Sequence, residues 1–168
     1  MFAARHHAFE QMVRTYTADL YRFAYWLCRD RSVAEDIVQE TFARAWKSWK
    51  DLRDEHTVKF WLFTVLRREH ARLYERRRLP LDPRPVEDID IAVESNTHAA
   101  LEMDEMLIML PVAYREPLLL QVLGGFSCAE IAQLLSISEA SVMTRVSRAR
   151  KMLRGFIESS DVVREVYS

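Results

Sequence analysis

The sequence predicts an all-α protein with two small helical domains joined by a flexible linker. Only three of its 168 residues are glycine and five are proline, and long β-branched alternations with turn signals are missing, which argues against a strand-rich fold. Apolar residues instead recur at steps of three and four, the spacing of helices with one buried face. A stretch of acids and prolines interrupts this pattern, so we expect domains at residues 1–78 and 99–168 and a linker at residues 79–98.

Three long helices are predicted in the N-terminal domain. The first, Ala8–Cys28, carries an apolar seam at alternating steps of four and three. The second, from Val33 to about Lys50, begins at a capping box formed by Ser32 and Glu35. The third, from Val58 to about Arg78, is apolar in its first half and rich in arginine in its second.

The second predicted helix carries a compact acidic and amide patch. Asp36, Gln39 and Glu40 point away from its inner face, with Phe42 beside them. Acids also suit the start of a helix because of its dipole, so a solvated helix start is one interpretation. A docking patch for a basic partner helix is the other.

The third predicted helix combines aromatic and basic residues. Bases of single-stranded nucleic acid stack on aromatic rings while phosphates follow cations, so this combination suits a single strand. Trp61 and Phe63 fit the hydrophobic core better than a stacking platform. The arginines outnumber what a helix C-terminus needs; they are Arg67, Arg68, Arg72, Arg76, Arg77 and Arg78.

In the C-terminal domain the helical pattern resumes at Ala99. A second helix opens at Pro111 and ends at Gly124-Gly125, where glycine suits a helix C-cap. The tail, residues 156–168, carries no functional signal.

A helix, a tight turn and a second helix follow. Ser127 and Glu130 form a capping box for the first helix, Ser136 occupies a turn position that requires positive φ, and Ser138 caps the second helix. The second helix buries Val142, Val146, Ala149 and Leu153 and presents Thr144, Arg145, Ser147, Arg148 and Lys151 on its opposite face. This pattern predicts a helix-turn-helix that enters the major groove; a helical hairpin with a solvated basic face is the alternative.

Charge is segregated along the chain although the formal net charge is only -1. Residues 67–78 hold six arginines against two acids, and residues 145–154 hold four arginines and one lysine without an acid. Residues 79–105 hold eight acids against one arginine. Two basic surfaces separated by an acidic connector suggest two contacts on one polyanion.

The sequence gives little support for an enzyme, a metal- or cofactor-binding protein, or a secreted or membrane protein. Cys28 and Cys128 form neither a disulfide framework nor a metal knuckle, and the five histidines are scattered. No glycine-rich phosphate loop or metal-ligand spacing is present, so we expect no enzyme, metal or cofactor. No apolar run predicts a signal peptide or a membrane span, and we expect a cytoplasmic protein.

With these features in order, the chain resembles bacterial RNA polymerase sigma factors of the extracytoplasmic-function (ECF) group. The resemblance covers roughly residues 9–154. It rests on three blocks: residues 34–42 with Ala45-Trp46; residues 60–63 leading into the arginine-rich helix; and Leu110-Pro111 with Arg115, followed by residues 125–127, 130–132 and 145–150. Their order and spacing together are specific to this group.

The resemblance implies a set of partners and contact residues. The clamp of the largest polymerase core subunit would bind Asp36, Gln39, Glu40 and Phe42, and the flap of the second subunit would also be contacted. The minus-10 element would be melted and held by Lys59, Phe60, Trp61, Arg67, Arg68, Arg72 and Arg76. The minus-35 element would be read by Met143, Thr144, Ser147 and Arg148, with Arg115, Arg145 and Lys151 nearer the DNA backbone. An anti-sigma factor is implied as well.

The chain departs from the family pattern in the third helix. Thr64 and Arg68 stand where the family commonly has an arginine and an asparagine. A helix-turn-helix regulator that binds duplex operators without core polymerase remains the alternative function. It would need a receiver or ligand-binding domain, and residues 9–78 show no strand or pocket signature of one.

Overall fold

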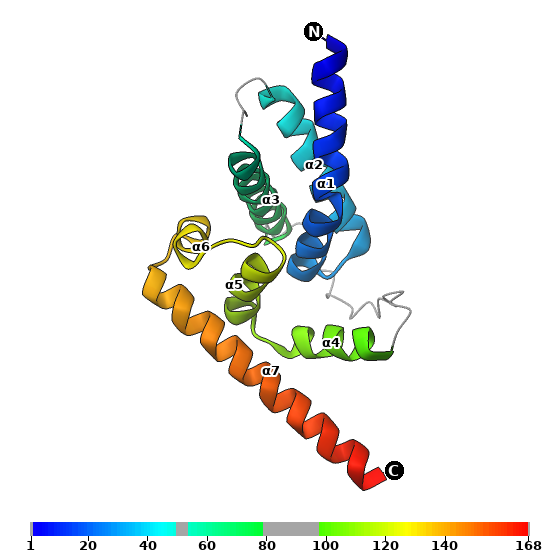
Figure 1. The fold of residues 1–168 in the computed structure, drawn as a ribbon, viewed down its shortest axis with the longest axis vertical. Coiled ribbons are helices and arrows are strands. Elements are labelled where there is room, and N and C mark those ends of the chain that lie inside the picture. Colours follow the sequence, from blue (N-terminus) through cyan, green and yellow to red (C-terminus); the bar gives the residue numbers. More distant parts are fainter. Residues whose placement is uncertain (1, 50–53, 79–97, 168) are drawn as a thin grey trace. The chain divides into compact units, whose positions relative to one another are not determined.

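The computed structural model describes residues 2–49, 54–78 and 98–167, which are helical apart from short turns (Figure 1). The chain divides into two compact units, Met1–Ile91 and Ala92–Ser168. This confirms the predicted all-α fold with two helical domains. The predicted linker lies outside the described residues except for His98.

Three helices that pack on one another form the first unit: α1 (Phe2–Cys28), α2 (Arg31–Ser48) and α3 (Glu55–Arg78). Their core is apolar and largely aromatic where α1 meets α3, with the rings of Phe23 and Phe63 centred 5.3 Å apart. Thr41 is buried on α2, and its hydroxyl is satisfied there by donating to the Ile37 carbonyl at 2.8 Å. Helices α2 and α3 also pack directly on each other.

The helix starts of the first unit differ from the predictions. Helix α2 begins two residues earlier than expected, because Asp30 rather than Ser32 is its N-cap and accepts a hydrogen bond from the Val33 N–H at 3.0 Å. Arg29 makes the turn with φ 55°. Helix α3 begins at Glu55 after Asp54, whose carboxylate accepts the Thr57 N–H and hydroxyl at 2.9 Å each.

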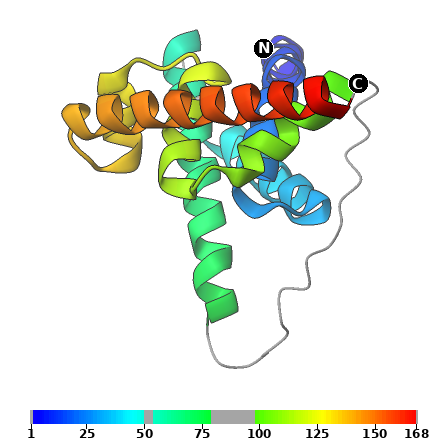
Figure 2. The ribbon, with the colours of Figure 1, turned by 90° about the horizontal axis from the view of Figure 1, so that it is seen from below.

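Four helices form the second unit: α4 (His98–Met109), α5 (Val112–Val122), α6 (Cys128–Leu135) and α7 (Glu139–Tyr167). Helix α7 contacts the other three. It continues without a break to Tyr167 (Figure 2), so the predicted tail is helical from residue 156 to Tyr167.

The two glycines between α5 and α6 make the sharp connection that sequence predicted. Gly125 has φ 65°, and its N–H donates to the Gln121 carbonyl at 3.1 Å. A side chain on Gly124 would clash with the Phe126 ring, and Phe126 is buried. The close approach thus anchors Phe126 in the core directly before the helix-turn-helix.

Candidate nucleic-acid interface

The helix-turn-helix has the local geometry that the sequence predicts. The Ser127 N–H donates to Glu130 Oε2 at 2.8 Å, and the Glu130 N–H donates to Ser127 Oγ at 3.2 Å, which confirms the capping box. Ser136 ends α6 in the left-handed region at φ 54°, ψ 43°. Ser138 Oγ accepts the Ser141 N–H at 3.1 Å and so caps α7. Inside α6 the buried residues are Ile131 and Leu134, whereas Ala132 and Leu135 are half-buried.

Helix α7 has one buried and one exposed face. Val142, Val146 and Ala149 are buried, and Leu153 is half-buried. The predicted minus-35 residues Met143, Thr144, Ser147, Arg148 and Lys151 are exposed, while Arg145 is half-buried. The exposed set combines cations, hydroxyls and a thioether, which can contact phosphates and base edges in a major groove.

Two arginines of α7 make hydrogen bonds to α5. Arg150 Nη2 donates to Gln121 Oε1 at 2.6 Å, and Arg148 Nη1 lies 3.5 Å from the Tyr114 hydroxyl. Gln121 and Tyr114 lie two turns apart on α5. These contacts supplement the apolar packing of α5 on α7 and orient two of the cations on the helix.

Arg115 occupies a different place from the one predicted. It is only 5% exposed, and its guanidinium donates to the carbonyls of Leu107 at 2.8 Å, Ile108 at 2.8 Å and Leu110 at 2.7 Å. The last carbonyls of a helix have no intrahelical donor, and Arg115 supplies donors for the C-terminal end of α4. We therefore correct its assignment from a DNA contact to a structural cap.

The acidic face of α2 lies on the surface of the first unit. Asp36, Gln39 and Glu40 are exposed, whereas Phe42 is half-buried. The helix buries Ile37, Thr41 and Ala45 on its other side, so the helical period alone separates the polar patch from the core.

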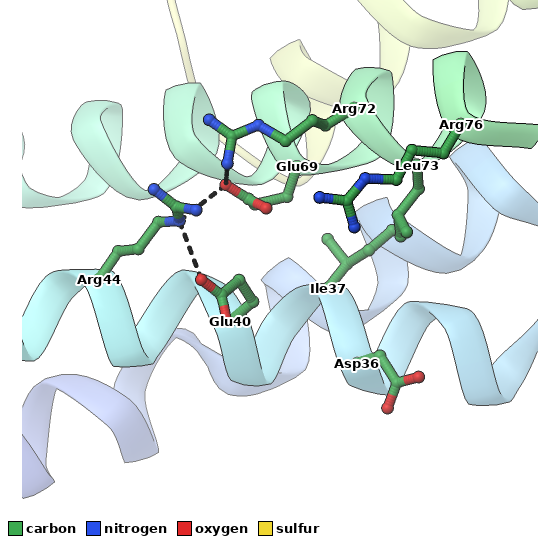
Figure 3. Close-up of a pocket in the computed structure, with 8 residues that line it drawn as sticks. All are labelled: Asp36, Ile37, Glu40, Arg44, Glu69, Arg72, Leu73 and Arg76. Carbon is green, nitrogen blue, oxygen red and sulfur yellow. Dashed lines mark ion pairs between the residues drawn. The ribbon is translucent and has the colours of Figure 1, made fainter.

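An open groove of about 380 Å³ runs between α2 and α3 (Figure 3). Charged side chains of both helices border it, and Asp36 points away from α3 (Figure 3). Its lining consists of Asp36, Ile37, Glu40, Arg44, Glu69, Arg72, Leu73 and Arg76. Two of the predicted polymerase-binding residues and two of the predicted minus-10 residues therefore border the same groove.

Ion pairs join the two walls of this groove, and sequence reasoning missed them. Arg44 Nε lies 3.0 Å from Glu40 Oε1 and 2.7 Å from Glu69 Oε1, and Arg72 Nη1 lies 3.5 Å from the same Glu69 oxygen (Figure 3). Glu69 is 8% exposed. Its position three residues after Leu66 and four after Val65 places it on the buried stripe of α3, and this spacing is a signal that could have revealed it.

The predicted minus-10 residues are distributed along α3. Lys59, Phe60, Trp61 and Arg67 are half-buried, and Arg68, Arg72 and Arg76 are exposed at successive four-residue steps. Phe63 is fully buried, as the core interpretation expects, whereas Trp61 remains partly accessible.

The start of α3 carries a perturbed acid. Hydrogen bonds from the Thr57 backbone N–H and hydroxyl hold the pKa of Asp54 below its usual range. The carboxylate therefore stays ionised at the helix N-terminus, where a negative charge is favoured.

Neither a metal site nor a membrane span emerges in the described parts of the chain. Residues 2–49, 54–78 and 98–167 contain no cluster of three or more potential metal ligands. Within the same ranges no helix is both long and apolar enough to cross a bilayer.

Both units match known protein families. The family described as Sigma-70 region 2 matches residues 12–79, and that described as Sigma-70, region 4 matches residues 100–153. The ECF RNA polymerase sigma factor SigM of Bacillus subtilis (strain 168) is 32% identical over 152 residues, which make up 86% of this chain and 92% of that relative.

Solved structures agree with this assignment. The sigma factor RpoE in complex with the anti-sigma factor NepR from Bartonella quintana is similar with a TM-score of 0.74 at 28% identity, over 90% of this chain and 97% of that one. CnrH in complex with the cytosolic domain of CnrY is similar with a TM-score of 0.63 at 26% identity, over 92% and 90%. The chain belongs to the ECF sigma factors of the sigma-70 family. Its function is to bind RNA polymerase core and direct promoter-specific transcription initiation.

Proposed function

We propose that the acidic face of α2 is the surface by which this sigma factor docks on the clamp of the largest core subunit. Asp36, Gln39 and Glu40 are exposed beside the half-buried Phe42. Charges at an interface rim guide a partner of opposite charge, and a half-buried aromatic offers apolar contact. The observation that carries the proposal is the exposure of these three polar side chains on α2, while Ile37, Thr41 and Ala45 of the same helix are buried.

The exposed face of α7 is proposed to read the minus-35 element. Arg148 and Ser147 lie in the middle of the helix-turn-helix surface, with Met143 and Thr144 toward the N-terminus of α7, which enters the groove first in such motifs. Arg145 and Lys151 supply phosphate contacts. Arg115 is excluded from this set because its guanidinium is occupied inside the unit.

Helix α3 is proposed to hold the minus-10 element. Arg68, Arg72 and Arg76 form an exposed basic track, and partly accessible aromatics lie at the N-terminal end of the helix. A flexible single strand can bind such a surface by stacking bases and pairing phosphates. The remaining members of the proposed set are Lys59, Phe60, Trp61 and Arg67.

Control by an anti-sigma factor is part of the proposal. The similar chains RpoE and CnrH were each solved in complex with another protein, NepR and the cytosolic domain of CnrY respectively. We further propose that this chain is a cytoplasmic initiation factor without enzymatic activity of its own, so that polymerase performs the chemistry.

A pair of adjacent charge reversals tests the docking face. Asp36→Lys places a cation on the proposed face, whereas Glu35→Lys makes the same change on an exposed residue about 100° away around the helix. We expect Asp36→Lys to lower affinity for purified core polymerase by about tenfold or more. Glu35→Lys should have a much smaller effect. Equal losses for both variants would show that net charge, not this face, governs core binding.

A further inference from the structure

Two arginines share one buried carboxylate at the base of the groove between α2 and α3. The Glu69 side chain is 11% exposed, whereas the Arg44 and Arg72 side chains are 38% and 51% exposed. Both guanidinium groups converge on the same oxygen, Glu69 Oε1 (Figure 3). A buried carboxylate needs such compensation because desolvation penalises its charged form.

The two arginines are not equivalent. Arg44 Nε lies 2.7 Å from Glu69 Oε1 and 3.0 Å from Glu40 Oε1, so it places a positive charge against the carboxylate from the α2 side, as an ion pair without a hydrogen bond from Nε. Arg72 lies at 3.5 Å and keeps about half of its side chain accessible. Arg44 therefore supplies most of the neutralising charge, and Arg72 is oriented by Glu69 while its guanidinium stays available to an external anion.

We propose that Glu69, held by Arg44, is a positioning residue that orients Arg72 toward a phosphate of promoter DNA. The proposal rests on the proposed function of α3 as the minus-10 surface. A long arginine side chain loses rotamer freedom when it binds, and an anchor that restricts it beforehand reduces this loss. Glu69 would thus strengthen DNA binding although it carries a negative charge.

The direction in which DNA affinity changes when Glu69 is neutralised separates a positioning role from a simple electrostatic one. Removing an acid next to a polyanion should tighten binding if only net charge matters. Glu75 provides the matched control, because it is an exposed acid on the same helix. We expect Glu75→Gln to leave DNA affinity unchanged or slightly increased. Glu69→Gln should instead weaken it by about 2- to 10-fold, the cost of ordering one long side chain.

The experiment uses the full chain assembled with core polymerase and a promoter recovered by run-off transcription from genomic DNA, with the minus-10 non-template strand left unpaired. Affinity is measured across a salt series for wild type, Glu69→Gln, Arg72→Ala and the double variant. Arg72→Ala should reduce the salt slope by about one phosphate contact. In the Arg72→Ala background, Glu69→Gln should cause no further loss.

Each outcome decides a separate question. Equal losses from Glu69→Gln with and without Arg72 would overturn the positioning role, as would tighter binding like that of Glu75→Gln. An Arg72→Ala variant with wild-type affinity would instead refute the DNA contact in the proposed function. Tryptophan fluorescence checks folding, since all four tryptophans lie in the first unit. If Glu69→Gln fails to fold, Glu69→Asp keeps the charge but shortens the anchor and should weaken binding in the same direction.

Discussion

Replacing Arg115 tests whether its buried guanidinium holds the second unit together. Arg115→Ala removes donors from three backbone carbonyls that lie 2.7–2.8 Å from the guanidinium nitrogens. Hydrogen bonds to a charged group contribute about 1.5–3 kcal/mol each. Water that reaches the freed carbonyls recovers part of this, so we expect a net loss of about 3–5 kcal/mol in the free energy of unfolding.

The loss should be confined to one unit. A domain of this size has about 4–10 kcal/mol of stability in total, so the variant should unfold its second unit at much lower urea. All four tryptophans lie in the first unit. Tryptophan fluorescence should therefore report an unchanged transition, while circular dichroism reports a new early one.

Two further variants complete the test of Arg115. Arg115→Lys keeps the charge, but a single ammonium group cannot span three carbonyls, and we expect a loss of about 2 kcal/mol. Arg154→Ala removes an exposed arginine of α7 and should change stability by less than about 0.5 kcal/mol. If Arg115→Ala unfolds like wild type and loses only DNA affinity, the capping role is refuted and a DNA contact is restored.

Three other changes address the two interfaces and the turn. Arg148→Ala should weaken binding to the cognate promoter by about 1–3 kcal/mol in fluorescence anisotropy, and equal loss on unrelated duplexes would show that Arg148 only contacts backbone. Glu40→Lys breaks the pair with Arg44 and reverses a charge on the docking face, so core affinity should fall about tenfold with an unchanged circular dichroism spectrum; unchanged affinity would remove Glu40 from that face. Ser136→Gly should raise stability in urea by about 0.5–1 kcal/mol, because φ is 54° there. No gain would mean that the turn is unstrained.

Local signals predicted the helix-turn-helix well. Two of its features are the capping box of Ser127 and Glu130 and the left-handed turn at Ser136. Both depend only on residues a few positions away, so the local sequence is enough to predict them. At α2 the predicted cap, Ser32, was wrong, because Asp30, directly after the turn at Arg29, accepts the Val33 N–H instead.

Tertiary contacts of charged residues could not be predicted in the same way. Arg115 lies three and four residues before Leu118 and Leu119, on a buried stripe, so its burial could have been inferred. Its hydrogen-bond partners could not have been inferred, because the carbonyls at the end of α4 come within reach of Arg115 only when α4 and α5 are packed. Glu69 is similar: its stripe indicates burial, but only the packing of α2 on α3 selects Arg44 as its partner.

The central claim is that this chain directs core polymerase to specific promoters. The most direct measurement is co-purification with bacterial RNA polymerase core, followed by run-off transcription on a genomic promoter pool with and without the chain. We predict a stable complex and new start sites that share minus-35 and minus-10 sequences. Binding to duplex DNA without any association with core would contradict this account and favour a helix-turn-helix regulator.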